Sequence, residues 1–317
     1  PRSTQKVLNN LDFFRGAVVD SRGFANFGCS RKGGRGQKKA EGKDGKKAGH
    51  GAVYIKANLL TRSYYRPNMI ETPTSLDGLL DRRVAIEQPT IGYRIAVDTV
   101  LLAAAVPALE GDKVLDMGCG VGGAMICLAC RVPGIKGLGI EVVPELVELC
   151  HHNIGRNAFA SGLLVRREDA TSLPPDLLGV FDHVLMNPPY HEEKRHDASP
   201  NNLKHAANIE KKGDLALWIS SAAAALKTSG TLTLIHRADR HDEILSLLKK
   251  SFGEIGVLPL LPKVGTVPKR MLFRARKNAA SIVQNCYPLI LHQDSGDYTE
   301  EADAILRLGE EISFRPY

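Results

Sequence analysis

The stretch from Val114 to Arg131 constrains the fold of this chain more than any other, because it joins an apolar strand to a helix through a glycine-rich turn. Residues 114–117 are short and apolar apart from Asp116, as expected for a buried strand. Glycines at positions 118, 120, 122 and 123 let the backbone approach a ligand closely and open the next helix N-terminus. The helical segment from Ala124 to Arg131 completes the unit. A strand, a glycine turn and a helix in this order predict a ligand site in an α/β fold.

The rest of the chain continues this alternation. The pattern predicts strands at 135–140, 163–166, 181–186, 231–235, 255–261 and 270–276, and helices near 214–226 and 239–252. Alternating strands and helices imply a parallel, doubly wound sheet. With 317 residues the chain is long enough for one or two domains and a sizeable core.

A polar side chain stands at the end of four predicted strands, in the order Asp116, Glu141, Asp169 and Asn187. The glycines with Glu141 also fit a dinucleotide-binding fingerprint, so an NAD site is an alternative. Asp116 argues against it, because a carboxylate two residues before the first glycine faces a pyrophosphate unfavourably. The same carboxylate suits a cation, and S-adenosylmethionine carries a sulfonium and an ammonium group but no phosphate. The set therefore favours S-adenosylmethionine as the cofactor.

The chemistry of that cofactor predicts which residues hold it. Gly118 and Gly120 bring the backbone to it, and Glu141, followed by Val142, can accept hydrogen bonds from both ribose hydroxyls. Asp169, followed by Ala170, can accept one from the adenine amino group.

The sequence Asn187–Pro188–Pro189–Tyr190 ends the predicted strand at 181–186 and predicts the catalytic site. A planar amine conjugated with a ring or carbonyl is a poor nucleophile, because its lone pair is delocalised. The Asn187 side-chain oxygen and the Pro188 carbonyl can accept hydrogen bonds from such an amine and localise that pair. The prolines fix the backbone, and Tyr190 offers an aromatic face for a flat substrate. Asn–Pro and Pro–Pro also mark ordinary turns, which is the alternative for this segment alone.

These features resemble the class I S-adenosylmethionine-dependent methyltransferases over about Leu80 to Lys277. The resemblance implies a seven-stranded, Rossmann-like sheet with an antiparallel last strand. Within that class, Asn–Pro–Pro–Tyr marks enzymes that methylate amino groups. These act on adenine N6, on some guanine N2 groups, or on a protein glutamine.

A more specific resemblance is to the bacterial tRNA(Val) adenine-37 N6-methyltransferase family. It rests on the segment Gly92–Leu102, in which Arg94 and Asp98 precede a Leu–Leu helix that covers the methionine end of the cofactor in that family. It also rests on the tail, including residues 262–265, 269–272, 289–292 and 298–302. The resemblance implies that Arg94 and Asp98 contribute to cofactor binding and that the substrate is the anticodon region of a tRNA.

Two other functions remain open at this point. A protein-glutamine methyltransferase acting on release factors faces the same chemical problem, although that family carries an N-terminal helical domain that residues 1–79 do not provide. The other is a non-catalytic cofactor-binding subunit of an RNA-modifying complex. The intact Asn–Pro–Pro–Tyr argues against it, because such a subunit does not need groups that hold an amine.

The first 68 residues differ sharply from the rest in charge. They hold 15 Lys and Arg against 4 Asp and Glu, a net of +11, which leaves 27 basic and 31 acidic residues, a net of −4, for the remainder. Residues 28–51 are a Gly/Lys/Arg run without apolar periodicity, and no methionine precedes Met69. We expect residues 1–68 to be a disordered basic extension that native translation from Met69 omits, and residues 69–317 to be the methyltransferase domain. A basic arm that binds nucleic acid is the alternative.

Because the remainder is mildly acidic, any RNA-binding surface must be local. The loop between the strands predicted at 255–261 and 270–276 emerges on the cofactor side, so Lys263, Lys269 and Arg270 are the predicted phosphate contacts. The mechanism needs no metal, and no run of 18 apolar residues predicts a membrane helix. Free cysteines and the lack of a visible signal peptide lead us to expect a cytoplasmic protein, and we expect a monomer.

Overall fold

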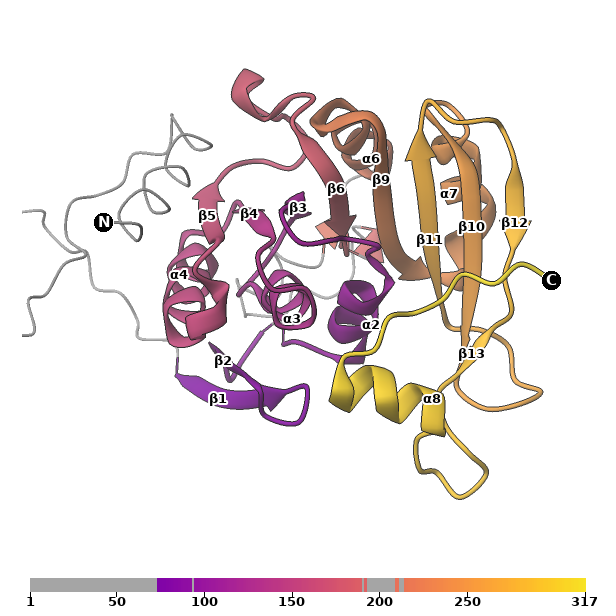
Figure 1. Ribbon diagram of the computed structural model, residues 1–317, viewed down its shortest axis with the longest axis horizontal. Coiled ribbons are helices and arrows are strands. Elements are labelled where there is room, and N and C mark those ends of the chain that lie inside the picture. Colours follow the sequence, from indigo (N-terminus) through magenta and orange to yellow (C-terminus); the bar gives the residue numbers. More distant parts are fainter. Residues whose placement is uncertain (1–72, 93, 190, 193–208, 211–213) are drawn as a thin grey trace, which may run out of the picture. The chain divides into compact units, whose positions relative to one another are not determined.

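The computed structural model describes residues 73–92, 94–189, 191–192, 209–210 and 214–317 (Figure 1). The expected basic extension at 1–68 and the side chain of Tyr190 lie outside the described residues.

A single mixed sheet forms the centre of the fold. From one edge its strands are β5 (Leu163–Arg167), β4 (Lys136–Glu141), β3 (Lys113–Met117), β6 (Phe181–Met186), β9 (Leu226–Arg237), β11 (Arg270–Lys277) and β10 (Phe252–Leu261). All pairings from β5 to β9 are parallel, whereas β11 lies antiparallel between β9 and β10. This arrangement confirms the expected doubly wound sheet with an antiparallel last strand.

Two short strands, β12 (Val283–Asn285) and β13 (Leu289–Ile290), extend the sheet beyond the seven expected. Both pair in parallel with the outer edge of β10, which gives a nine-stranded sheet. The sequence did not predict them because each has only two or three residues, too few to show a period.

Helices cover both faces of the sheet (Figure 1). Helices α2 (Val97–Ala105), α3 (Gly123–Arg131) and α4 (Pro144–Arg156) contribute to one apolar core, and α6 (Asp214–Ala225) and α7 (His241–Leu248) contribute to the other. The alternation along β3 follows these two cores, since Val114 belongs to the first and Leu115 and Met117 to the second. Asp116 therefore points to the face covered by α2 and α3.

An antiparallel hairpin precedes this sheet, formed by β1 (Thr74–Leu79) and β2 (Val84–Pro89). Strand β2 contacts α3 and α4. The hairpin was not predicted from the sequence. Its strands do not alternate strictly between apolar and polar residues, and its turn at residues 80–82 has positive φ angles without a glycine.

Strand β9 begins at Leu226, five residues before the expected start at 231, and α6 ends at Ala225. The sequence predicted that the helix would end near residue 226 and that Gly230 would form a turn before the strand. In the structure Ser229 has a φ of 65°, and the pairing of β9 with β6 shifts register near Asp182. The chain therefore passes through this irregularity without leaving the sheet.

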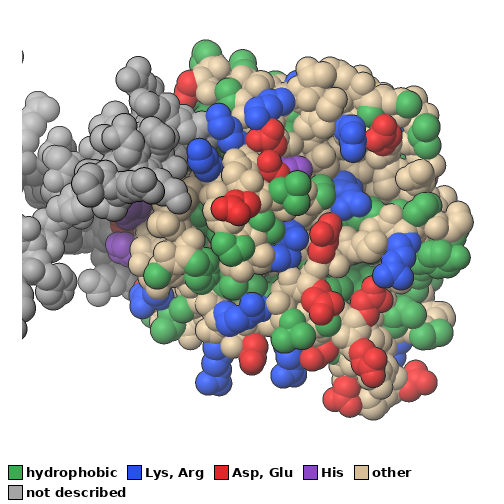
Figure 2. Space-filling view, in the orientation of Figure 1, with side chains coloured by type: hydrophobic (Ala, Val, Ile, Leu, Met, Phe, Trp, Pro, Cys, Tyr) green, Lys and Arg blue, Asp and Glu red, His purple; other side chains and the backbone are tan. Residues whose placement is uncertain are grey.

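The minor elements lie mainly at the edges of the fold. They are η2 (Ala158–Ala160), η3 (Pro175–Leu177), η4 (Ala238–Arg240), α8 (Glu300–Asp303), the π-helical turn η5 (Ala304–Leu308), and the two-residue strands β7 (His191–Glu192) and β8 (Ile209–Glu210). None of the helices in the described ranges is long and apolar enough to cross a membrane. Basic and acidic side chains are intermixed over the face seen in Figure 2, and acidic ones gather around α8. This face therefore shows no broad basic surface.

Candidate active site

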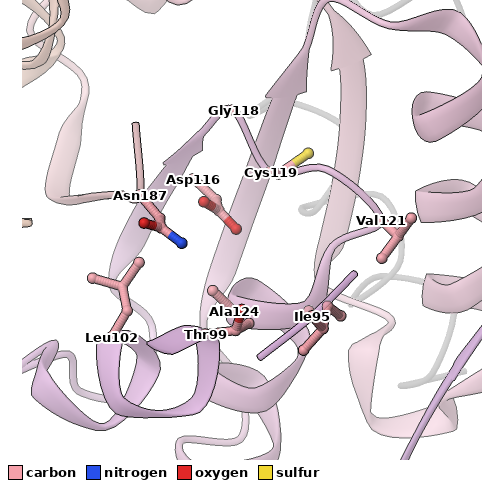
Figure 3. A pocket seen from close by; sticks show the side chains of 10 residues that line it. Ile95, Thr99, Leu102, Asp116, Gly118, Cys119, Val121, Ala124 and Asn187 are labelled. Atoms are coloured by element: carbon pink, nitrogen blue, oxygen red, sulfur yellow. The ribbon is translucent and has the colours of Figure 1, made fainter. Parts of the chain in front are cut away.

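A cavity opens where the carboxyl ends of β3 and β6 meet the N-terminal parts of α2 and α3 (Figure 3). Its lining comes from three segments that are far apart in the sequence: Ile95, Thr99 and Leu102; Asp116, Gly118, Cys119, Val121, Gly123 and Ala124; and Asn187. Neighbouring strands pair Asp116 with Leu185 and Met117 with Met186, so Asp116 and Asn187 emerge side by side. The cavity brings together the first and last of the predicted strand-end residues.

Asp116 is the buried acidic side chain in the lining of this cavity. The residue is 3% exposed, and its Oδ2 atom has no hydrogen-bond partner among the residues that the structure describes. Burial raises the pKa of this carboxyl from 3.8 to about 8, a hydrogen bond from the Met125 backbone opposes the rise, and the nearby Glu141 charge adds to it. A buried carboxylate without a partner is costly, and a cationic ligand would relieve that cost. This unpartnered oxygen fits a ligand that carries an ammonium or sulfonium group.

The turn after Asp116 depends on glycine at two positions. Gly118 has a φ of 67°, and a Cβ atom there would lie 2.5 Å from Cη2 of Trp218 on α6. Gly122 has a φ of 88° and precedes α3 as its N-cap, with Cys150 of α4 2.7 Å from the place of its missing Cβ. The turn is therefore confined by side chains from both faces of the sheet, and the backbone forms the floor of the cavity.

Glu141, the last residue of β4, lies beneath the same turn. Its Oε2 accepts a hydrogen bond from Gly120 N at 3.0 Å, and its Oε1 accepts from Val142 N and Val143 N at 2.9 and 3.0 Å. The side chain is buried, whereas Val142 is exposed. These contacts fix the carboxylate at the start of α4, and Oε2, which accepts from Gly120 N, keeps a lone pair that can accept from a ligand hydroxyl.

Asp169 and Ala170 follow β5, at the edge of the sheet and outside the lining of the cavity. Oδ1 of the exposed Asp169 accepts hydrogen bonds from the backbone and hydroxyl of Thr171, at 2.8 and 2.7 Å, and Ala170 is buried. The carboxylate thus stabilises its own turn. Its role toward the adenine amino group stays a prediction.

Asn187 lines the cavity, and Pro188 and Pro189 continue the chain from it. Figure 3 shows the Asn187 amide beside the Asp116 carboxylate, with Leu102 and Thr99 of α2 facing them. Pro188 is buried and Pro189 partly buried, so the segment is held in place by the fold. The Asn187 amide therefore lies next to the Asp116 carboxylate, which suits a cation.

Arg94 and Asp98 lie at the margin of the cavity. Arg94 donates to Asp77 Oδ2 at 2.8 Å, to the Ser75 hydroxyl at 2.9 Å and to the Pro89 carbonyl at 3.0 Å, all in the β1–β2 hairpin. Asp98, in the first turn of α2, accepts from Arg270 Nε at 2.9 Å. Neither lines the cavity. Their predicted contacts with the cofactor stay untested.

The loop at 262–269 emerges at the same edge of the sheet as the cavity, because β10 runs parallel to β9 and β6. Its three predicted phosphate contacts differ in their surroundings. Lys263 Nζ donates to the Asp294 carbonyl at 3.1 Å, Lys269 is exposed, and Arg270 pairs with Asp98. Val264 and Val267, on the same loop, are 73% and 79% exposed. The Arg270–Asp98 pair connects this loop directly to α2 and so to the cavity wall.

Several residues of the site carried no catalytic signal in the sequence. Leu102 belongs to the Leu–Leu helix that the resemblance placed over the cofactor, but Ile95 and Thr99 line the cavity and look like ordinary core residues. Trp218, the only tryptophan of the chain, lies against Gly118. Asn153 is fully buried on α4 and hydrogen-bonded to the glycine turn. The sequence did contain one indication for Asn153, since its spacing places this polar residue on the apolar face of α4 with Leu146 and Cys150.

Comparison with known proteins gives a consistent result. A family model described as the methyltransferase small domain matches residues 93–259. A tRNA1(Val) (adenine(37)-N6)-methyltransferase of Haemophilus influenzae (strain PittEE) is 23% identical over 226 residues, covering 71% of this chain and 94% of that protein. A protein of the same name from Porphyromonas gingivalis (strain ATCC 33277) is 27% identical over 235 residues, covering 69% and 89%.

Among solved structures, a predicted O-methyltransferase from Agrobacterium tumefaciens is similar with a TM-score of 0.58 and 26% sequence identity. The match covers 68% of this chain and 98% of that one. This likeness supports the class of fold described above.

Proposed function

The chain belongs to the methyltransferase small domain family, and from this premise we propose that it transfers a methyl group to the exocyclic N6 amine of an adenine in tRNA. Family membership confirms the predicted methyltransferase activity, with S-adenosylmethionine as the methyl donor. The names of the two bacterial relatives support the adenine and the tRNA, and both align over most of their own length. A tRNA substrate and the free cysteines support a cytoplasmic location.

The observation that carries this proposal is the shared cavity of Asp116 and Asn187. Asp116 supplies a buried carboxylate whose Oδ2 has no partner among the described residues and can face a cation, and Asn187 supplies an amide for an amine. The two stand on adjacent parallel strands, so a methyl donor and a methyl acceptor can meet without any rearrangement of the sheet. A dinucleotide would place phosphate against Asp116, which this geometry disfavours.

The residues that would hold the cofactor are Asp116, the turn from Gly118 to Gly120, and Glu141, with Asp169 further along the sheet edge. When bound, S-adenosylmethionine supplies an already activated electrophilic methyl group. The protein therefore needs to exclude water and orient the acceptor, and Leu102, Ile95 and Val121 give the cavity an apolar wall for this purpose.

Asn187 and Pro188 act on the acceptor. The side-chain oxygen of Asn187 and the carbonyl of Pro188 accept hydrogen bonds from the target amine, which localises its lone pair and aims it. No strong base is required, because the amine loses its proton after the nitrogen has become cationic. Tyr190 is proposed to stack on the base. An adenine in an anticodon loop is partly unstacked already, which lowers the cost of bringing it into the site.

The loop at 262–269 is proposed as a contact for the RNA. Lys269 is positioned for a phosphate, and the exposed Val264 and Val267 offer apolar surface to a base or ribose. Lys263 and Arg270 are tied to Asp294 and Asp98, so an RNA phosphate must compete for them.

The proposal is tested by incubating the protein with methyl-labelled S-adenosylmethionine and unmodified tRNA, followed by mass spectrometry of the nucleosides. N6-methyladenosine in the tRNA is the expected product, and Asn187→Ala should abolish most of it. Label in a release-factor peptide instead would identify a glutamine methyltransferase. No transfer to either substrate, despite cofactor binding, would indicate a non-catalytic subunit.

A further inference from the structure

The outer edge of β2 is paired with two side chains of α4 instead of a third strand. Asn153 Oδ1 accepts from Glu87 N at 2.8 Å and its Nδ2 donates to Glu87 O at 2.8 Å. Asn157 makes the same pair of bonds with Ala85, at 3.0 and 2.9 Å. Each side-chain amide thus reproduces the two hydrogen bonds that a neighbouring strand would provide.

The two asparagines differ in one further contact. Asn153 Nδ2 also donates to the carbonyl of Val121, at 3.0 Å, in the glycine turn. The second bond of Asn157 Nδ2 goes to Asn153 O, at 2.7 Å, and so stays within α4. Both side chains are buried, with exposures of 0% and 4%. Asn153 therefore joins the hairpin, α4 and the cavity floor at one point, whereas Asn157 joins only the first two.

The turn that Asn153 contacts is rich in glycine, and one of its hydrogen bonds lies within the turn, from Gly122 N to Cys119 O at 2.9 Å. Val121 lies between Gly120 and Gly122, whose φ angles are 55° and 88°, and glycine has the widest conformational freedom of any residue. The Val121 carbonyl is the only atom of this turn to which a side chain of α4 is seen to donate among the described residues. A fixed donor at that carbonyl limits the conformations of the backbone that faces the ligand.

The next residue of β2 holds a second part of the cavity wall. Gln88 Oε1 accepts from Ile95 N at 2.8 Å, and its Nε2 donates to Asp77 Oδ2 at 2.8 Å, with the side chain 4% exposed. Ile95 and Val121 both line the cavity. Residues 87 and 88 of the hairpin are thus connected to two sides of the site through buried amide groups.

We propose that Asn153 is a positioning residue for cofactor binding, and that through it the β1–β2 hairpin sets the conformation of the glycine turn. This inference rests on the proposed placement of the cofactor at that turn, and it is independent of which nucleotide is methylated. Without the Asn153 amide, the Val121 carbonyl loses its partner and the turn samples conformations that do not match the ligand.

The test compares Asn153→Ala with the matched variant Asn157→Ala. Both lose two bonds to β2, so both should lower the free energy of unfolding. Only Asn153→Ala should weaken binding of S-adenosylhomocysteine in calorimetry, by about tenfold or more, and speed amide hydrogen exchange at residues 120–123. In the methylation assay the KM for the cofactor should rise, while the KM for RNA stays within about twofold. Equal losses of affinity in the two variants, or unchanged affinity in Asn153→Ala, would overturn the proposal.

A second pair of variants keeps the test decisive if Asn153→Ala does not fold. Asn153→Asp preserves the shape and the acceptor to Glu87 N, but a carboxyl has at most one donor and cannot serve both the Glu87 and the Val121 carbonyls. Its affinity for S-adenosylhomocysteine should fall below that of Asn157→Asp measured at the same pH. Equal affinities in the two variants contradict the inference.

One further variant separates this inference from the placement of the cofactor. Asp116→Asn should bind S-adenosylmethionine weakly. If it binds as well as the unchanged protein, the cofactor lies elsewhere and the placement itself fails. If Asp116→Asn loses affinity and Asn153→Ala does not, only the positioning role of Asn153 is wrong.

Discussion

Replacing Asp116 by Asn should change how the stability of the protein depends on pH. The carboxyl is buried at the cavity floor, and its pKa is raised from 3.8 to about 8, mainly by burial. Asn has nearly the same shape and can keep the hydrogen bond from the Met125 backbone, but it cannot ionise. The variant therefore isolates the effect of the charge from the effect of packing.

The sign of the effect follows from proton linkage. Below pH 3.8 the carboxyl is protonated in both the folded and the unfolded protein, so it has no influence. Between pH 3.8 and 8 the unfolded chain loses this proton and the folded protein keeps it, so stability falls as the pH rises. The slope is ~1.4 kcal/mol per pH unit. From pH 5 to pH 8 the loss amounts to about 4 kcal/mol, a large part of the stability of a typical domain.

The assay is denaturant unfolding at several pH values between 5 and 8, without cofactor, for both proteins. We expect the stability of Asp116→Asn relative to the unchanged protein to increase by about 4 kcal/mol over this range. Other titrating groups, such as the buried His236 whose pKa is lowered to about 4, cancel in the comparison. A difference that stays constant with pH would refute the reasoning and show that the Asp116 carboxyl ionises normally.

Three further predictions concern the same edge of the sheet. Asn187→Ala should lower kcat by about 10²-fold, a loss of roughly 3 kcal/mol of transition-state stabilisation, and leave cofactor affinity unchanged in calorimetry; a loss of cofactor binding would contradict its assignment to the acceptor. Gly118→Ala should destabilise the protein and weaken cofactor binding, because its Cβ would lie 2.5 Å from the Trp218 side chain. The control Gly111→Ala also introduces a Cβ at a positive φ, but into open space, so it should leave cofactor affinity unchanged. Equal effects of the two variants on affinity would exclude the contact with Trp218 as the cause. Charge reversal at Lys263 and Lys269 together should raise the RNA KM strongly and leave cofactor affinity unchanged. Reversal at Arg276, which lies on the far part of β11 and pairs with Glu254 at 3.1 Å, should raise the RNA KM much less. If the double reversal has no effect, the loop at 262–269 is not part of the RNA-binding surface.

The sequence alone determined the order and type of the main elements of the sheet and the identity of the residues at its carboxyl edge. Both depend on local patterns, because apolar strands, glycine turns and helices each leave a signature within about ten residues. Asp116 and Asn187 were both predicted to end strands of a parallel sheet, and the structure places both in one cavity. Where the local pattern is weak, the sequence did not predict the structure. This holds for the β1–β2 hairpin, for β12 and β13, and for the start of β9.

The tertiary structure decided which partners these residues have. The pairing of Asp98 with Arg270 spans 172 residues, and that of Asn153 with Glu87 spans 66, so no local pattern contains either. The burial that raises the pKa of Asp116 likewise depends on α2, α3 and the glycine turn packing around it. Periodicity specifies which face of an element is apolar, but the partner of a buried polar group is set by whichever distant element packs against that face.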